Sequence, residues 1–548
     1  MGAPLPDSID SPNGRYLLER RVSLPASQLW TLQRAFYASH GHEIWADASV
    51  PHYITSNPVI ADAQAQVIIG FLRDLRVQGS LPVGAQLNVI ELGSGAGRFG
   101  FLLIQRLRWL ISHSSLTHVA VRLVMTDFTQ EAAAKLARHR QLQPLAEAGW
   151  VDFAQFDAAT PGALHLLHSG ETLYADSTTE AMVIVANYVL DSLPQECVGL
   201  LGGEAQRGLL TVESAEPFDL ASPATASAEL SLTWDYRSLE DAAGPALGPE
   251  WTAVLASYAD VLDDTAMLLP TAALDCMGHF RASGGGPRLF LFTDKGIART
   301  SELMGRGDPG VAWHGGCFSM MVNFDALGRC ISARGGLALH PWHQPAHIVS
   351  AAYVLGDHGP WPETELAYVD NLAEGGPDDF FSLQAAALAD PGSLTLSQML
   401  TYLRISRFDP VVFLACFPPL LDVVAGAPAD ARPDVARVVE AVWAQYFAIG
   451  EETDLAVCVG LILTAMHYYA EAERYFHVSI AEHGANADAA LGLALCANGR
   501  GDVPGAMDHV EESLGLNPGL QSALTLRRSL TVELARTLLD RPRLSGDH

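Results

Sequence analysis

The sequence predicts an α/β protein in which a doubly wound, mostly parallel sheet is followed by an all-helical region. A strand-like apolar run, residues 87–92, leads into a turn with glycines at positions 93, 95 and 97 and then into an amphipathic helix, residues 99–111. Strand-like and helical runs then alternate up to residue 339, as parallel strands joined by crossover helices require. Beyond residue 361 the pattern is helical.

Length and charge narrow the classes of function. A chain of 548 residues with 49% hydrophobic residues can form two to four domains, each with its own core. The formal net charge is −29, with 33 basic and 62 acidic residues. Nucleic-acid binding depends on clustered Lys and Arg, so we expect no nucleic-acid partner. An acidic surface instead favours cationic partners.

The sequence predicts a soluble, cytoplasmic protein. Its seven cysteines are scattered and include no C-x-x-C pair, which is typical of reduced thiols. The N-terminus lacks the basic and apolar segments of a signal peptide. The most apolar stretch, residues 411–424, contains Pro418, Pro419 and Asp422, and it is too short to span a bilayer. No membrane partner is expected.

We expect three regions in the chain. Residues 1–80 should hold a loose arm (1–25), a helix capped by Ser27 and a helix over 59–78. Residues 81–345 should form the α/β domain, with an insertion near 200–287 over the edge of the sheet. Residues 360–548 should form the helical domain.

Polar residues stand at the ends of successive predicted strands. The strands cover residues 87–92, 120–125, 151–155, 182–186 and 288–293. The polar residues at the first four of these strand ends are Glu91, Asp127, Asp157 and Asn187. Because the carboxyl ends of parallel strands lie along one edge of a sheet, these side chains should converge beside the glycine turn.

The glycine turn itself resembles a known motif. Its spacing, E-x-G-x-G-x-G, differs from the dinucleotide motif G-x-G-x-x-G with a later acid. It is similar to the signature loop of class I S-adenosylmethionine (SAM) methyltransferases, and this resemblance implies SAM as the cofactor. Asp127 would then accept hydrogen bonds from the ribose hydroxyls, Asp157 would accept one from the adenine amino group, and Glu91 would face the ammonium end. The expected cofactor residues are Thr55, Ser56, Glu91, Gly93, Ser94, Gly95, Gly97, Asp127, Phe128, Phe156, Asp157, Ala158 and Asn187.

Four stretches over residues 30–340 narrow the resemblance to the MidA-like methyltransferases, the family of the mitochondrial complex I assembly arginine methyltransferase. Residues 187–194, Asn-Tyr-Val-Leu-Asp-Ser-Leu-Pro, resemble its Asn-Glu-x-x-Asp-Ala-Leu-Pro motif. Residues 54–58, 292–296 and 321–327 resemble three further motifs in the same order. Three residues depart from the family pattern, namely Val59, Tyr188 and Lys295. Two acids that could face a guanidinium are therefore replaced.

Asn187 and Asp191 are the expected catalytic residues. Their spacing of four places both side chains on one face of a helix or turn, where they suit a basic nitrogen as methyl acceptor. The alternative is that Asn187 pins the strand end while Asp191 caps the next turn. His314 is a further catalytic candidate in a loop over the site. We expect no metal site, because His40, His42 and Glu43 lack a second cluster, and His340 with His343 lacks partners.

A repeat of 34 residues marks the helical region. It relates Ala472 to Ala506 and Phe476 to Val510, and the pattern closes at Pro518. Small and apolar residues at these positions resemble the tetratricopeptide (TPR) pattern. A TPR-like stack would either hold a peptide or act as a cap that allows homodimers to form.

Together these features predict a SAM-dependent methyltransferase. The expected acceptor is a nitrogen of a basic protein or peptide held by the helical domain, with arginine favoured by the family resemblance. Two alternatives remain open. One is a small-molecule N- or O-methyltransferase with an oligomerising helical domain, and the other is a non-catalytic SAM-binding assembly factor.

Overall fold

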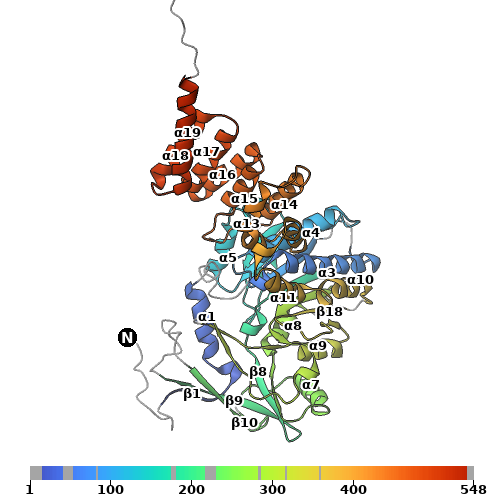
Figure 1. Ribbon diagram of the computed structural model, residues 1–548. Helices are drawn as coiled ribbons and strands as arrows, with labels where there is room; N and C mark the ends of the chain where they lie inside the picture. Colours follow the sequence, from blue (N-terminus) through green and yellow to red (C-terminus); the bar gives the residue numbers. More distant parts are fainter. Residues whose placement is uncertain are drawn as a thin grey trace, which may run out of the picture. The chain divides into compact units, whose positions relative to one another are not determined.

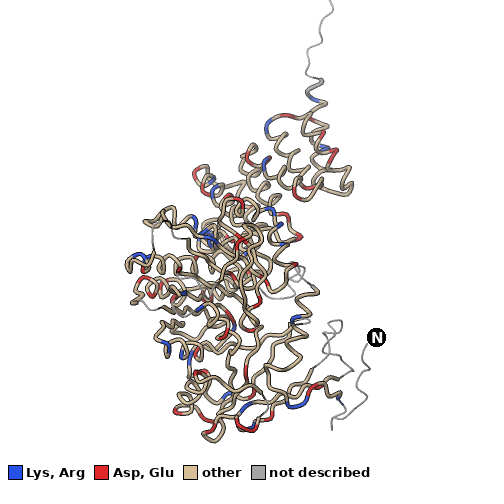
Figure 2. The backbone as a smooth tube through the Cα atoms, turned by 180° about the vertical axis from the view of Figure 1, so that it is seen from behind, with Lys and Arg blue, Asp and Glu red and all other residues tan. Residues whose placement is uncertain are grey.

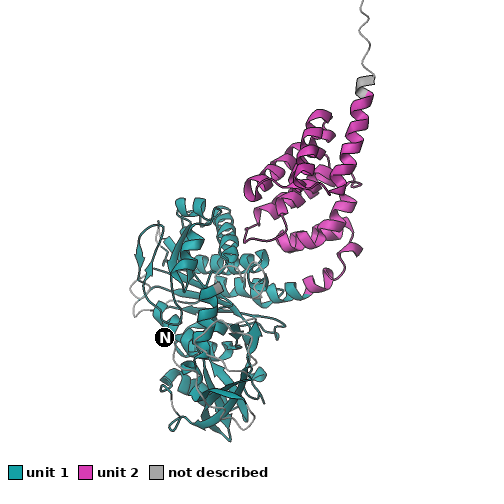
Figure 3. Ribbon diagram, turned by 90° about the vertical axis from the view of Figure 1, so that its left-hand side faces the viewer, with its two compact units in different colours: residues 1–382 teal, residues 383–548 magenta. Residues whose placement is uncertain are grey.

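A computed structural model describes residues 15–40, 53–81, 84, 86–174, 180–215, 230–242, 244–281, 285–314, 317–356 and 359–539. The chain divides into two compact units, residues 1–382 and 383–548 (Figure 3). The first unit is a mixed α/β structure and the second is helical. The predicted order of a mixed α/β sheet followed by a helical region is confirmed.

A seven-stranded sheet organises unit 1. Its order is β17 (Leu337–Leu339), β18 (Val349–Leu355), β12 (Arg288–Asp294), β7 (Met182–Asn187), β2 (Gln86–Leu92), β3 (Ala120–Asp127) and β4 (Val151–Gln155). Neighbouring strands from β12 to β4 pair in parallel, and β18 is antiparallel to both of its neighbours. From β2 the chain first builds outward to β4 and then returns to β7 on the other side. The boundary between β2 and β7 is thus a topological switch point, where such sheets bind ligands.

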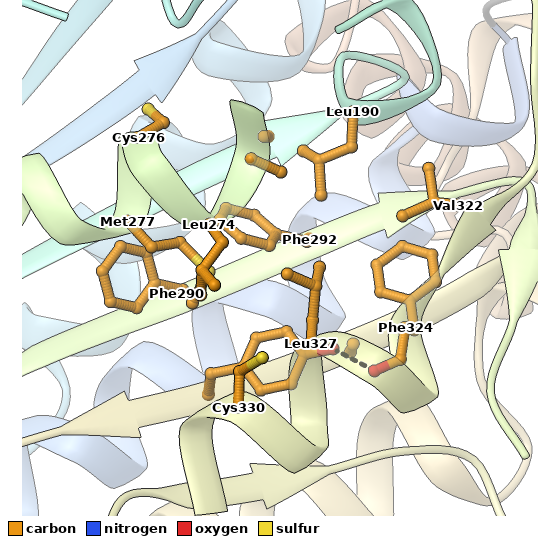
Figure 4. Close-up of a cluster of buried hydrophobic side chains, with 14 of the residues drawn as sticks. Leu190, Leu274, Cys276, Met277, Phe290, Phe292, Val322, Phe324, Leu327 and Cys330 are labelled. Carbon is orange, nitrogen blue, oxygen red and sulfur yellow. Dashed lines mark hydrogen bonds between the residues drawn. The ribbon is translucent and has the colours of Figure 1, made fainter. Parts of the chain in front are cut away.

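Helices cover both faces of this sheet (Figure 1). On one face, α3 (Pro58–Val77) packs against α4 (Arg98–Ser112) and α10 (Pro362–Tyr368). On the other, Phe290 and Phe292 of β12 share a buried cluster with α8 (Thr271–Phe280) and α9 (Phe324–Ala333) (Figure 4). Residues two apart on a strand face the same side of the sheet, so Phe290 and Phe292 both point toward these helices.

The insertion after β7 builds a second sheet, and this sheet includes the N-terminal segment. Its strands are β1 (Tyr16–Ser23), β8 (Glu196–Leu201), β9 (Glu204–Ser214), β10 (Leu230–Ser238) and β11 (Thr265–Leu269). The expectation of a loose arm over residues 1–25 is wrong for residues 16–23, which pair antiparallel with β9. Residues 1–14 lie outside the described residues. This strand could not be predicted from the local sequence, because its partner lies about 190 residues further along the chain.

The helix after β1 begins as the sequence predicts. Ser27 Oγ accepts a hydrogen bond from the Leu29 amide and donates one to Glu19, and α1 (Leu29–His40) follows. Other helices of unit 1 are α5 (Gln130–Ala137), α6 (Gln143–Glu147) and α7 (Pro249–Ala259). The short strands are β5 (Leu164–His165), β6 (Thr172–Leu173), β13 (Gly296–Ile297), β14 (Ala312–His314), β15 (Cys317–Ser319) and β16 (Val322–Asn323). Short 3-10 or π segments are η1 (Leu24–Ala26), η2 (Tyr53–Thr55), η3 (Leu190–Ser192), η5 (Thr300–Glu302) and η6 (Val369–Ala373).

The first unit extends beyond the boundary expected at residue 360. Asp74 of α3 is buried and accepts hydrogen bonds from the amides of Glu363 and Thr364 at the start of α10. These bonds satisfy amides that have no partner inside α10. The division falls within α11 (Pro377–Ala387).

Unit 2 consists of η7 (Pro391–Ser393) and helices α12 (Leu396–Ile405), α13 (Pro410–Val424), α14 (Arg432–Ala444), α15 (Leu455–Ala465), α16 (Tyr469–His483), α17 (Ala487–Gly499), α18 (Val503–Leu516) and α19 (Gln521–Leu539). Residues related by the 34-residue spacing are buried alike: Ala472 with Ala506, and Phe476 with Val510. A Cβ on Gly460 would stand 2.7 Å from the Phe476 ring, so the close approach of α15 and α16 requires glycine there. The TPR-like assignment stays a prediction.

No helix in the described part of the chain is long and apolar enough to cross a membrane. All seven cysteines are buried and unpaired. Acidic and basic positions are interspersed in both units (Figure 2).

Candidate functional site

The glycine turn follows β2 at the switch point. Gly93, Gly95 and Gly97 have φ angles of 62°, 51° and 87°, in the left-handed region that side chains rarely adopt. A Cβ on Gly93 would also lie 2.9 Å from Val189 Cγ2. The turn therefore needs glycine for its backbone shape, and Gly97 forms the N-cap of α4.

Glu91 lies buried under this turn, between the sheet and α4. A Cβ on Gly100 of α4 would lie only 2.3 Å from Glu91 Oε2, so the absence of a side chain there makes room for the carboxyl group. Burial raises the pKa of Glu91 to about 8, although Ser94 and the Gly100 amide partly offset the rise. Neither Glu91 Oε2 nor Ser94 Oγ has an oriented hydrogen-bond partner among the described residues. Unsatisfied buried polar atoms are costly, and here both belong to residues that line a cavity.

The expected cofactor residues surround two adjoining cavities. One, of about 60 Å³, lies at the glycine turn, and the other, of about 130 Å³, extends toward β3 and β4. Both are lined by Leu92, Gly93, Gly95 and Tyr188. The smaller cavity is lined by Thr55, Ser56, Glu91, Ser94, Gly97 and Asn187, and the larger by Asp127, Phe128, Phe156, Asp157 and Ala158. The structure thus brings together every residue of the expected set.

The two aspartates differ in their surroundings. Burial raises the pKa of Asp127 to about 6, and its Oδ1 accepts a hydrogen bond from the Thr129 amide. Burial alone would raise the pKa of Asp157 too, but hydrogen bonds from Arg34, the Ala159 amide and Thr160 outweigh it and lower that pKa. Asp157 is therefore held as a carboxylate.

Helix α1 supplies residues that sequence reasoning missed. Gln33, Arg34 and Tyr37 line the larger cavity. Arg34 donates two hydrogen bonds to Asp157, at 3.1 and 2.7 Å, and its guanidinium carbon lies 5.0 Å from the centroid of the Phe128 ring. No local signal marks these residues, because only the tertiary fold places α1 over the ends of β3 and β4.

Asn187 is the last residue of β7, and Tyr188 follows it. Asn187 Oδ1 accepts a hydrogen bond from Gln64 Nε2 at 2.9 Å, and its Nδ2 donates to the Thr55 carbonyl at 3.3 Å. Tyr188 has a φ of 54°, a strained conformation for an aromatic residue. Its amide still donates a hydrogen bond to the Thr293 carbonyl at 2.9 Å.

Tyr188 also lines a third cavity of about 580 Å³ on the β12 side of the switch point. The other lining residues are Tyr53, Ile54, Lys295, Gly296, Met321, Pro345, Ala346, His347, Ile348, Val349 and Phe381. We call this space the acceptor cavity. One wall is fixed by Asp378, whose carboxylate accepts hydrogen bonds from three consecutive amides, those of Ala346, His347 and Ile348.

Asp191 is not among the residues that line the acceptor cavity. Asn187 and Asp191 do not share the face of one helical turn. Tyr188, between them, has a left-handed φ, and the helical segment η3 begins only at Leu190. Asp191 instead makes a carboxyl–carboxyl hydrogen bond with the fully buried Asp294. Burial raises the pKa of Asp191 to about 6, and burial with the neighbouring Asp191 raises that of Asp294 well above its usual value.

The other candidate residues lie apart from these cavities. His314 belongs to β14, and its Nε2 lies 3.1 Å from Ser319 Oγ. Burial and the charge of Lys295 lower the pKa of His314. His343, Asp378 and Asp379 lie close enough together to hold a metal ion, but the Asp378 carboxylate already accepts hydrogen bonds from the three amides described above. The cluster of His40, His42 and Glu43 falls outside the described side chains.

Comparisons with known proteins add little to this picture. No family model matches the chain, and no curated protein matches it. Two solved structures from Burkholderia thailandensis are similar to it, each at 15% identity with a TM-score of 0.33 over 62% of this chain. One, an uncharacterized superfamily protein, is covered over 97% of its length. The other, a member of the same superfamily described as a "likely methyl transferase" and bound to S-adenosyl-homocysteine, is covered over 96%.

Proposed function

We propose that the protein is a SAM-dependent methyltransferase. The observation that carries the proposal is the glycine turn at the switch point, beside Glu91 Oε2 and Ser94 Oγ, which have no oriented hydrogen-bond partner among the described residues. An ammonium group there would give both atoms a donor. Asp127 and Asp157, which follow the next two strands, offer carboxylates in one cavity that could accept hydrogen bonds from ribose and adenine. When bound, SAM supplies an electrophilic methyl group on a sulfonium sulfur.

The chain's own residues would act mainly by positioning. In-line transfer to a nucleophile gains most of its acceleration from holding the reactants in place. Tyr188 borders the cofactor cavities and the acceptor cavity, so its ring would lie where the two reactants meet. Gln64 fixes the amide of Asn187 on the cofactor side of that junction.

The acceptor is proposed as a nitrogen, and the family resemblance favours arginine in a protein or peptide. One observation favours a small-molecule or non-cationic acceptor instead. Among the described residues, the acceptor cavity is lined by Lys295 and by no Asp or Glu side chain. Two like charges about 4 Å apart repel by roughly 4 kcal/mol near a protein surface, so this wall opposes a guanidinium. A SAM-binding assembly factor without activity would show cofactor binding alone.

Two measurements test the proposal. Calorimetry of the full chain with SAM and S-adenosyl-homocysteine should show saturable binding. If neither compound binds, the assignment of SAM as the cofactor is wrong. Incubation with methyl-labelled SAM and cell extract, followed by mass spectrometry, should identify a labelled acceptor. Asn187→Ala and Asp191→Asn then test the catalytic pair, with SAM affinity measured as the control. Loss of turnover at saturating SAM supports a catalytic role, whereas normal turnover in both variants removes the pair from catalysis.

A further inference from the structure

Lys295 is the one lysine or arginine among the described residues that line the acceptor cavity, and it also lines a neighbouring cavity of about 400 Å³. The chain contains only two lysines, Lys135 and Lys295, among its 33 basic residues. In the described part of the chain the cations of the side-chain ion pairs are Arg or His. Lys295 therefore differs from the other basic residues both in type and in place.

The ammonium of Lys295 is half-buried and has no ion pair or hydrogen bond with any described side chain. Its Nζ lies 5.9 Å from the centroid of the Tyr188 ring. The buried pair of Asp191 and Asp294 lies close enough for the charge of Lys295 to lower the pKa of Asp191. The carboxyl groups of Asp191 and Asp294 form hydrogen bonds with each other, with Ser192 and with backbone amides. The N–H donors of Lys295 are thus left for the cavities that it lines.

The position of Lys295 follows from the sheet. Thr293 of β12 pairs in parallel with Asn187 of β7, so Lys295 and Tyr188 both emerge just beyond the carboxyl ends of neighbouring strands. A cation placed there lies beside the junction of the cofactor and acceptor spaces. Tyr53, Tyr188 and Phe381 supply aromatic surface around it.

We propose that Lys295 forms an anion-binding subsite of the acceptor cavity, so that the methyl acceptor carries a carboxylate or a similar anionic group next to an aromatic or apolar part. This inference rests on the proposed function, because it assigns the cavity to the acceptor. It replaces the expected basic acceptor by one of opposite charge.

Three probes of the same shape and different charge test the subsite: benzoate, benzamide and benzamidine. Calorimetry on the full chain, saturated with S-adenosyl-homocysteine, should show benzoate binding about tenfold tighter than benzamide, with benzamidine weakest. Lys295→Met should lose about tenfold in benzoate affinity while benzamide changes by less than about twofold. Lys295→Arg should retain benzoate binding even if Lys295→Met fails to fold.

The two lysines also allow the binding site to be located. With ¹³Cε-labelled lysine the full chain gives two lysine signals, and Lys135→Arg assigns the exposed one. Benzoate should shift the Lys295 signal and leave the Lys135 signal in place. Equal benzoate affinity in wild type and Lys295→Met, or strongest binding of benzamidine, would overturn the subsite while leaving the methyltransferase proposal intact. Wild-type protein that binds no S-adenosyl-homocysteine would overturn the proposed function and, with it, the acceptor role of Lys295.

Discussion

Arg34 and Asp157 form a bidentate ion pair at the larger cofactor cavity, with nitrogen–oxygen distances of 3.1 and 2.7 Å. The guanidinium also lies over the ring of Phe128. Asp157 is the residue expected to accept a hydrogen bond from the adenine amino group, and Phe128 is another expected cofactor residue. The guanidinium of Arg34 therefore occupies the carboxylate that adenine would need.

The first prediction follows from this competition. Arg34→Ala should tighten S-adenosyl-homocysteine binding by up to about fivefold, because a partly exposed ion pair contributes about 0.2–1 kcal/mol. Calorimetry measures the change, and the double variant with Asp157→Asn provides the control, since the gain should vanish once the carboxylate is removed. Weaker binding in Arg34→Ala would mean that Arg34 covers the bound adenine instead of competing with it.

The glycine turn and Asp127 should be needed for cofactor binding. Gly95→Val should abolish it, since φ is 51° and the turn has no room for a side chain between backbone and ligand. Asp127→Ala should weaken it by about ten- to a hundredfold through lost charge-assisted hydrogen bonds. Gly149→Val is the matched control, because Gly149 also has a positive φ, 76°, but no other group within 4 Å of its Cβ position. Unchanged cofactor affinity in both site variants would remove the central proposal.

Cofactor binding should release a proton from Glu91. With a pKa of about 8 the carboxyl group is mostly protonated at neutral pH, and a neighbouring ammonium favours the carboxylate. Binding enthalpies in two buffers of different ionisation enthalpy should reveal up to about one proton released near pH 7. Release should decline above pH 8 and be absent in Glu91→Gln. A buffer-independent enthalpy in the wild type would exclude this coupling.

The buried pair of Asp191 and Asp294 should make stability depend on pH. Both pKa values are raised in the folded state, so the stability that the protonated pair contributes is fully present below about pH 4 and is lost as pH rises through about 6 and above. Denaturant titrations should show the free energy of unfolding falling with pH over this window, and less steeply in Asp294→Asn. The slope is the readout, because the amide cannot replace both carboxylate acceptors and will lower stability at every pH. Parallel slopes in the two proteins would contradict the assignment.

The two units should separate. A chain of residues 1–389 keeps α11 intact and should bind S-adenosyl-homocysteine within about twofold of the full-length affinity, since the described cofactor-cavity residues all lie in unit 1. Calorimetry and thermal melting of the shortened chain test this. An insoluble or unfolded product would show that unit 2 completes the fold of unit 1.

The sequence alone was sufficient for the elements that local pattern controls. Short continuous apolar runs, the glycines at 93, 95 and 97, and polar residues at strand ends predicted the strands around the site and its expected cofactor residues. These features are readable because a tight turn and a buried strand impose their requirements on neighbouring residues. The repeat in unit 2 is readable for the same reason.

Only the tertiary structure decided which distant segments complete the site. β1 finds its partner in β9, Arg34 reaches Asp157 from α1, and Gln64 holds Asn187 from α3. Each pairing joins residues more than 100 positions apart, and no feature of the sequence around one partner indicates the other. The face on which Asp191 lies was decided in the same way, by the left-handed Tyr188 and by burial against Asp294. Such contacts are fixed by the burial of whole faces of helices and sheets, a property of the assembled chain and not of any one stretch of its sequence.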